Sequence, residues 1–312
     1  MKSRIFAPMV LALALLLVLG AGAHAADKVK AIASFSILGD MVRNVGGDRV
    51  EVTALVGPDG DAHVYEPTPV DAKALAAANI LCVNGLGFEG WMDRLETSSG
   101  FKGQVVVASQ GVQPRQMVED EKRIIDPHAW QSLANGKLYV ANIRDGLIAA
   151  DPDGKAVYEA NAAKYLGEIA AEEAAVKEAL GKLPAERRKI ITSHDAFGYF
   201  GAAYGLEVIA PEGVSTESEA SAKDVAKIIR QIKAEKVPAV FMENISDHRL
   251  LDQIARETGA KIGGVLYTDA LSQPSGPAAT YLDMFRHNIG ALTAGAGVVR
   301  PVLARGPQIW FI

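Results

Sequence analysis

Four residues spread along the chain could together hold one divalent metal ion. They are His63, His128, His194 and Asp269, and each lies in a loop that follows, or can follow, a short apolar strand. Three imidazoles and one carboxylate complete a tetrahedral shell, which suits zinc above all. The four residues lie 65, 66 and 75 positions apart, far beyond the ligand spacing of a zinc finger. Only the complete fold can therefore bring them together.

The elements that must position these residues follow a parallel α/β pattern. Short apolar runs alternate with helical stretches, which is typical of strand–helix–strand units. The predicted strands form two groups of four: Val29–Phe35, Val50–Val56, Ile80–Asn84 and Val105–Ala108, then Lys189–Ser193, Leu206–Ala210, Ala239–Glu243 and Lys261–Leu266. We therefore expect an α/β fold with two lobes, each a four-stranded, mainly parallel sheet flanked by helices.

The longest helical pattern lies between the two halves, from about Lys155 to Leu183. Its apolar residues recur at three- and four-residue steps, the spacing of one helical face. At 1.5 Å per residue it spans on the order of 40 Å, enough to run the height of a two-lobed molecule. We expect an N-terminal lobe over 26–153, a rigid linking helix over 154–183 and a C-terminal lobe over 184–312. Because one helix offers no free hinge, the lobes should rock slightly rather than close widely.

The four metal-ligand candidates fall where α/β sheets bind ligands. In open sheets of this class, ligands gather at the carboxyl ends of the strands. His194 directly follows a predicted strand of the second half, and Asp269 comes just past another. His63 and His128 lie in loops of the first half. With two ligands from each lobe, the site should lie in the cleft between them.

Each ligating imidazole needs an acceptor for its other ring N–H. Four acidic residues near the ligands or at a strand end are candidates, with helix capping or a solvated charge as the alternative for each: Glu66, Asp126, Asp195 and Glu243. Of the other histidines, His24 lies in the N-terminal leader. His248 and His287 are predicted to lie in solvated positions on helices.

Composition limits the class of protein. The chain has 312 residues, of which 49% are hydrophobic, enough for one large or two small α/β domains. Its formal net charge is −5, which disfavours binding to nucleic acid or anionic membranes. Cys82 is the only cysteine, so no intramolecular disulfide can form. It lies in an apolar run and is predicted to fill a buried strand.

Residues 1–25 have the pattern of a secretory signal peptide. A basic start, Lys2 and Arg4, precedes the apolar run Met9–Leu19 and the small-x-small site Ala23-His24-Ala25. No cysteine stands at the cleavage site, and no later segment reaches ~18 uninterrupted apolar residues. We therefore expect export into a bacterial periplasm without a direct membrane anchor.

Four ordered motifs resemble the cluster A-I metal-binding proteins of bacterial ABC importers, which serve zinc and manganese uptake. The matching segments are Asp61-Ala62-His63-Val64-Tyr65-Glu66-Pro67-Thr68-Pro69, Asp126-Pro127-His128-Ala129-Trp130, Ser193-His194-Asp195-Ala196-Phe197-Gly198-Tyr199-Phe200 and Tyr267-Thr268-Asp269-Ala270-Leu271. The likeness covers about residues 28–295. It implies two α/β lobes around a long helix, with His63, His128, His194 and Asp269 as ligands.

The resemblance favours zinc as the metal. Zinc members usually carry a third histidine, here His194, where manganese or iron members often carry glutamate, and imidazole-rich sites suit zinc better. Two features depart from many zinc members: Ser109–Asp126 contains no histidine, and one cysteine cannot form the disulfide found in some. The chain looks most like the AztC type, which implies a periplasmic zinc chaperone as a partner. The tail 300–312 has no identified family counterpart.

We therefore expect a non-enzymatic, monomeric, high-affinity carrier that binds one Zn²⁺ per molecule and delivers it to an ABC permease in the inner membrane. The nearest alternative is a manganese or iron carrier of the same family. Two remote alternatives are a secreted zinc hydrolase and an adhesin with a structural metal. A hydrolase needs an open coordination position and a nearby base, whereas four protein ligands would fill the shell and no H-E-x-x-H motif is present.

Overall fold

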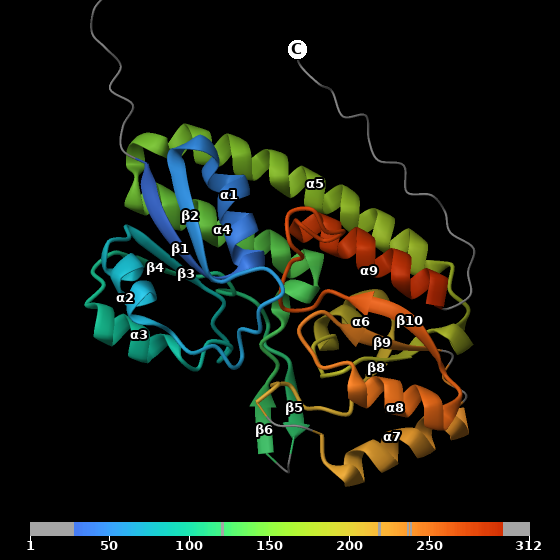
Figure 1. Cartoon of the computed structure of the whole chain (residues 1–312). Coiled ribbons are helices and arrows are strands. Elements are labelled where there is room, and N and C mark those ends of the chain that lie inside the picture. The colour runs from blue at the N-terminus through green and yellow to red at the C-terminus, as the bar shows by residue number, and fades with distance from the viewer. Residues whose placement is uncertain (1–27, 120–121, 218–219, 236, 238, 296–312) are drawn as a thin grey trace, which may run out of the picture.

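Two parallel sheets, one in each half of the chain, form the framework of the protein (Figure 1). The computed structural model describes residues 28–119, 122–217, 220–235, 237 and 239–295. The proposed signal peptide and the tail 300–312 lie outside these residues. In the first sheet the strand order is β2-β1-β3-β4, and every neighbouring pair is parallel. Its strands are β1 (Val29–Phe35), β2 (Val50–Val56), β3 (Ile80–Val83) and β4 (Gln104–Val107).

The second sheet repeats this plan in the order β10-β9-β7-β8, again with parallel pairs. Its strands are β7 (Lys189–Ile191), β8 (Glu207–Ile209), β9 (Ala239–Glu243) and β10 (Lys261–Leu266). The central strands β1, β3 and β9 are almost continuously apolar and almost wholly buried, as expected for strands covered on both faces. Cys82 is fully buried in β3, which confirms its predicted place.

Helices cover both faces of each sheet (Figure 1). The N-terminal lobe has α1 (Ser36–Gly46) and α4 (Leu133–Ala150) on one side, with α2 (Pro69–Ala76) and α3 (Met92–Ser99) on the other. The C-terminal lobe has α6 (Gly198–Tyr204) and α9 (Tyr281–Gly295) toward the linking helix, and α7 (Ala222–Glu235) and α8 (Arg249–Thr258) on the opposite side. This arrangement directs the carboxyl ends of both sheets toward the boundary between the lobes.

The linking helix is α5 (Lys155–Gly181), which has 27 residues and contacts α1 and α4 in one lobe and α6 and α9 in the other. The residues buried along it keep the predicted helical spacing and include Tyr158, Tyr165, Ile169 and Val176. Since two parallel sheets with flanking helices are joined by one long helix, the predicted fold class is confirmed.

The lobes also touch directly, through a buried apolar core that continues from one into the other. Backbone N–H groups of the C-terminal lobe donate to side chains of α1: Leu271 to Ser36 Oγ at 2.9 Å, and Tyr281 to Asp40 Oδ2 at 2.9 Å. Separating the lobes would break these bonds and expose the shared core.

One structural element was not predicted from the sequence. The antiparallel hairpin of β5 (Gln116–Glu119) and β6 (Lys122–Ile125) lies within Ser109–Asp126, where we predicted no strand. Its apolar residues come in adjacent pairs, Met117-Val118 and Ile124-Ile125, so it lacks the alternation that marks a half-buried strand. Of the described residues, none belongs to a helix long and apolar enough to cross a membrane.

Candidate metal centre

His63 lies in the loop that follows β2, and its position depends on contacts to the residues just before it. The backbone N–H of His63 donates to Asp61 Oδ1 at 2.9 Å. The indole Nε1–H of Trp91 donates to the carbonyl of Ala62 at 2.8 Å. The His63 ring packs edge-on against Phe88, with the ring centroids 4.8 Å apart. The hydrogen bonds of the loop and the contact with Phe88 therefore fix the position of this imidazole.

His128 lies just after the hairpin, at the start of a short 3₁₀ turn, Ala129–Gln131. Both its backbone N–H and its Nδ1–H reach Asp126 Oδ1, at 3.0 and 2.9 Å. The carbonyl of Pro127 accepts a hydrogen bond from Asn84 at the end of β3, at 2.9 Å. One carboxylate oxygen thus fixes both the backbone and the ring of His128, so that Nε2 points to the lobe boundary.

The C-terminal lobe supplies His194 after β7 and Asp269 after β10. Glu243, at the end of the intervening strand β9, accepts from the backbone N–H of His194 at 3.1 Å, and its other carboxylate oxygen contacts His194 Nδ1. The carbonyl of Thr268 accepts hydrogen bonds from Trp130 Nε1 at 2.9 Å and Gln131 Nε2 at 2.7 Å. Because these donors belong to the other lobe, the peptide next to Asp269 is held across the boundary.

The donor atoms of the four predicted ligands meet at this boundary. Asp269 Oδ2 lies 3.2 Å from His63 Nε2, 3.8 Å from His128 Nε2 and 3.0 Å from His194 Nε2. The Nε2 atoms of His63 and His128 are 3.3 Å apart, and one donor atom of each residue lies within 4.8 Å of all the others. Tetrahedral zinc with bonds of about 2.0–2.1 Å places neighbouring donors roughly 3.3 Å apart. The cluster therefore has the dimensions of a metal shell.

Polar atoms of this cluster are buried without hydrogen-bond partners. His128, His194 and Asp269 have no exposed surface, and His63 is 7% exposed. His194 Nε2 and both carboxylate oxygens of Asp269 have no hydrogen-bond partner among the described residues, although Nε2 and Oδ2 lie 3.0 Å apart. Orphaned buried polar groups are costly, and a bound cation would satisfy them. The donor set thus fits a divalent metal.

The pKa shifts of the cluster reflect its burial and its single negative ligand. Burial lowers the pKa of His63, opposed in part by Asp269. Burial alone would also lower the pKa of His194, but the charges of Glu243 and Asp269 outweigh it and raise that pKa well above its usual value. Burial raises the pKa of Asp269, but His194 and His128 overcome this and hold it well below its usual range. Asp269 is therefore an anion surrounded by imidazoles.

Of the four predicted acceptors, two bond to an imidazole and two do not. Asp126 and Glu243 contact the Nδ1 atoms of His128 and His194. Asp195 is half-buried beside the cluster, where burial and the charge of Asp126 raise its pKa, but no hydrogen bond joins its carboxylate to an imidazole in the described part of the chain.

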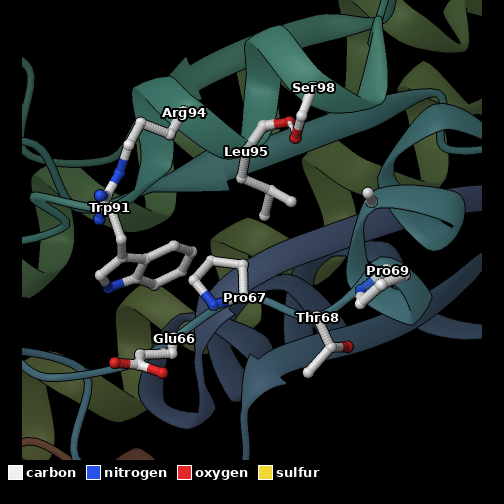
Figure 2. Close-up of a pocket in the computed structure, with 9 residues that line it drawn as sticks. Glu66, Pro67, Thr68, Pro69, Trp91, Arg94, Leu95 and Ser98 are labelled. Carbon is white, nitrogen blue, oxygen red and sulfur yellow. Dashed lines mark hydrogen bonds between the residues drawn. The ribbon is translucent and has the colours of Figure 1, made fainter.

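Glu66 was expected near His63 but lies away from it. Its side chain is exposed, and within the described ranges no hydrogen bond or ion pair joins it to His63. It lines a surface pocket of about 550 Å³ with Pro67, Trp91 and Arg94 (Figure 2). The prediction for Glu66 is wrong because the chain turns to the surface directly after His63.

The remaining histidines stay outside the cluster. His248 is exposed at the start of α8, as predicted. His287 is half-buried, donates from Nε2 to the carbonyl of Val265 at 2.9 Å and packs edge-on against Tyr267. The prediction of a solvated role for His287 is therefore wrong, since its ring ties α9 to β10.

Sequence reasoning missed the aromatic wall of the cluster. Trp130 packs beside His128, with centroids 5.3 Å apart, and Phe88 contacts both His63 and Trp130. It also missed a close approach at Gly198, where a Cβ atom would lie 2.4 Å from Asp126 Oδ2. The motifs around His128 and His194 contain Trp130 and Gly198, but nothing in the sequence showed that either residue touches the site.

Two α/β lobes, joined by one long helix and enclosing converging imidazole and carboxylate donors, are characteristic of metal-binding solute-binding proteins. The profile of the family described as "Zinc-uptake complex component A periplasmic" matches residues 32–295. The chain belongs to this family, whose members are solute-binding proteins rather than enzymes.

Individual relatives carry different metals in their names. The chain is 35% identical over 270 residues to the manganese-binding lipoprotein MntA of Halalkalibacterium halodurans, covering 86% of this chain and 89% of that protein. It is 33% identical to the iron-binding protein YfeA of Yersinia pestis, covering 87% and 88%. The solved structure of the periplasmic zinc-binding protein TroA of Treponema pallidum superposes with a TM-score of 0.82, at 30% identity, covering 86% and 99%.

Proposed function

We propose that the protein captures one Zn²⁺ between its lobes, through His63, His128, His194 and Asp269, and delivers it to an ABC permease. The observation that carries this proposal is the convergence of three Nε2 atoms on one buried carboxylate oxygen, at 3.0–3.8 Å. Neutral imidazoles are the borderline-soft ligands that zinc prefers, and the anionic carboxylate partly neutralises the ion. Four protein donors fill the shell, as a carrier requires.

The cellular setting belongs to the same proposal. The leader pattern of residues 1–25 supports export to the periplasm, and relatives such as PsaA of Streptococcus pneumoniae are named as substrate-binding components of manganese ABC transporters. The protein would act there as a monomer. Since residues 109–126 contain no histidine, the ion reaches the cleft directly or from a periplasmic zinc chaperone.

Manganese or iron transport is the second candidate, and one structural feature favours it beyond the names of the relatives. Asp269 Oδ1 is buried and has no hydrogen-bond partner within the described residues, so it is available as a fifth donor beside Oδ2. A second carboxylate oxygen raises the coordination number above the four of tetrahedral zinc, and harder Mn²⁺ accepts carboxylate oxygen more readily. Transport of Mn²⁺ or Fe²⁺ would thus use the same four residues with a bidentate Asp269.

Metal exchange tests both candidates. The protein is stripped with a chelator, reloaded with Zn²⁺ in the presence of a large excess of Mn²⁺, because divalent sites in general bind Zn²⁺ more tightly than Mn²⁺, and analysed for both elements after gel filtration. We expect one zinc per molecule and no retained manganese. One manganese per molecule would support the second candidate, and zero or two metals per molecule would contradict the four-ligand site.

A variant of Asp269 tests the ligand set itself. Asp269→Ala removes the only negative donor, whereas three histidines can still hold zinc with water in the fourth position. It should bind zinc more weakly than the wild type, but more tightly than the double variant His128→Ala/His194→Ala. If its affinity and release rate equal those of the wild type, Asp269 is not a ligand.

A further inference from the structure

The three imidazoles of the cluster differ in what fixes their rings. The Nδ1 atoms of His128 and His194 contact buried carboxylates, Asp126 and Glu243 respectively. No described residue provides a hydrogen-bond acceptor for Nδ1 of His63. Carboxylate partners fix ring orientation and increase the affinity of a ligating histidine. The peptide before Asp269 is held by Trp130 and Gln131. His128, His194 and Asp269 therefore form a group with a fixed framework, the three-ligand seat, to which His63 is added by its loop.

The loop that carries His63 is fastened to the opposite lobe by Asp61. One carboxylate oxygen of Asp61 accepts the backbone N–H of His63 at 2.9 Å, and the other accepts the hydroxyl of Thr216, after β8 in the C-terminal lobe, at 2.6 Å. Asp126 stands at the same spacing before His128 but uses one oxygen for both the backbone and the ring. In both Asp-x-His turns the aspartate accepts the backbone N–H of the histidine. Asp126 also bonds to the imidazole of His128, whereas Asp61 bonds to Thr216 of the other lobe.

A second tie fastens the same loop, and His63 is the ligand nearest the surface. The backbone N–H of Asp59 donates to the carbonyl of Leu271 at 2.9 Å, and Asn244 Nδ2 donates to Asp59 Oδ1 at 3.1 Å. His63 is 7% exposed, whereas the next residue, Val64, is 49% exposed. The loop therefore covers the seat from the solvent side and has contacts to both lobes.

We propose that the Asp61–Thr216 bond is a latch, and that His63 is the last ligand to close over the ion and the first to leave. This inference rests on the proposed metal-carrier function. Opening the latch removes the tie nearest His63 while the Asp59 contacts keep the start of the loop in place. His63 can then move away while the seat keeps three donors, so the ion can leave without wide separation of the lobes. Asp61 is a positioning residue in this scheme, because it acts through the backbone of His63 and through Thr216.

Matched threonine variants test the latch. Thr216→Val removes the hydroxyl at nearly constant volume, and Thr216→Ser keeps it. Thr97→Val removes an exposed hydroxyl on α3 that bonds to the carbonyl of Asp93 in the same helix. Each protein is loaded with Zn²⁺ and mixed with excess chelator in a stopped-flow instrument. Because Thr216→Val loses one hydrogen bond of ordinary strength, it should release Zn²⁺ roughly 3- to 10-fold faster than the wild type. The association rate should change little, and Thr216→Ser and Thr97→Val should match the wild type.

A double-variant comparison and one ligand variant complete the test. If Asp61 acts through the latch, Thr216→Val should add no further acceleration to Asp61→Ala. His63→Ala should retain more zinc affinity than His128→Ala, because the seat survives in it. Equal zinc release rates in Thr216→Val and Thr97→Val would overturn the latch while leaving the carrier function intact. Equal losses of zinc affinity in His63→Ala and His128→Ala would do the same. A wild-type protein that binds neither Zn²⁺ nor Mn²⁺ would instead refute the carrier function.

Discussion

Replacing Glu243 by glutamine should weaken metal binding although Glu243 lies outside the proposed ligand set. The side chain is fully buried. Its Oε1 accepts backbone N–H bonds from Ser193 at 2.7 Å and His194 at 3.1 Å, and its Oε2 contacts His194 Nδ1. A carboxylate can accept at both ends, but an amide accepts at only one. Glu243→Gln therefore keeps the shape of the side chain and forces a conflict at one end.

Either orientation of the amide carries a cost. If its NH₂ group faces His194 Nδ1, the imidazole must hold its proton on Nε2, the atom that should bind the ion. If the NH₂ group faces the two backbone N–H groups, two buried donors lose their acceptor, at about 1–3 kcal/mol each. Loss of an outer acceptor typically lowers metal affinity 10- to 100-fold, or about 1.4–2.8 kcal/mol. We expect zinc affinity to fall within this range.

Chelator competition at one fixed pH measures the change. Glu257→Gln on α8 is the matched control, since the Glu257 side chain is exposed and, among the described residues, bonds only to Gln253. Thermal unfolding of the metal-free proteins shows whether Glu243→Gln still folds. A folded Glu243→Gln protein with the zinc affinity of Glu257→Gln would refute the assigned role of Glu243 in orienting His194.

Three further predictions follow from the site and the lobe boundary. His128→Ala and His194→Ala should each weaken zinc binding by orders of magnitude in chelator competition, whereas His248→Ala should match the wild type; equal effects would mean that the wrong histidines were chosen. The charges of Glu243 and Asp269 raise the pKa of His194 in the metal-free protein, and metal binding must displace protons from the imidazoles. Zinc affinity should therefore fall as pH drops from 8.5 to 5.5, with the decline beginning above pH ~6.5; a flat titration would contradict this. Burial raises the pKa of Asp40 from 3.8 to about 6, so between these values the folded protein holds a proton that the unfolded chain has lost, and rising pH disfavours the fold. Between pH 4 and 7 the free energy of unfolding of the wild type should therefore fall by about 2–3 kcal/mol relative to that of Asp40→Asn, as measured by denaturant unfolding. A difference between the two proteins that does not change with pH would rule out the raised pKa of Asp40.

The sequence predicted the framework because the apolar runs of buried parallel strands and of α5 are strong local signals. The predicted ends of the strands were less accurate. The strand predicted to end at Ser193 is β7, which ends at Ile191. Strand limits depend on the hydrogen bonds of neighbouring strands, which one segment does not encode. The hairpin within Ser109–Asp126 was missed because its apolar residues come in adjacent pairs, Met117-Val118 and Ile124-Ile125, and do not alternate with polar ones.

The predicted ligands converge because residue type and position after a strand are both visible in the sequence. The partners of these residues were harder to predict. Asp126 lies two residues from His128 and bonds to it through a local turn, but Glu66 lies three residues from His63 and points to the surface. Glu243 reaches His194 across about 50 positions because β9 lies between β7 and β10, a strand order that one sequence does not reveal.

Because the cluster joins distant segments of the chain, metal binding affects how quickly the protein is degraded. Because the residues of the cluster come from four loops spread over most of the chain, partial unfolding of either lobe dismantles the cluster, so metal binds the native state alone. By mass action, free metal at 100 times the dissociation constant then adds about 2.7 kcal/mol to the stability of the fold. Proteases cut unfolded chains, so loaded molecules outlast empty ones. The amount of the protein would then follow the metal supply, even at a constant rate of synthesis.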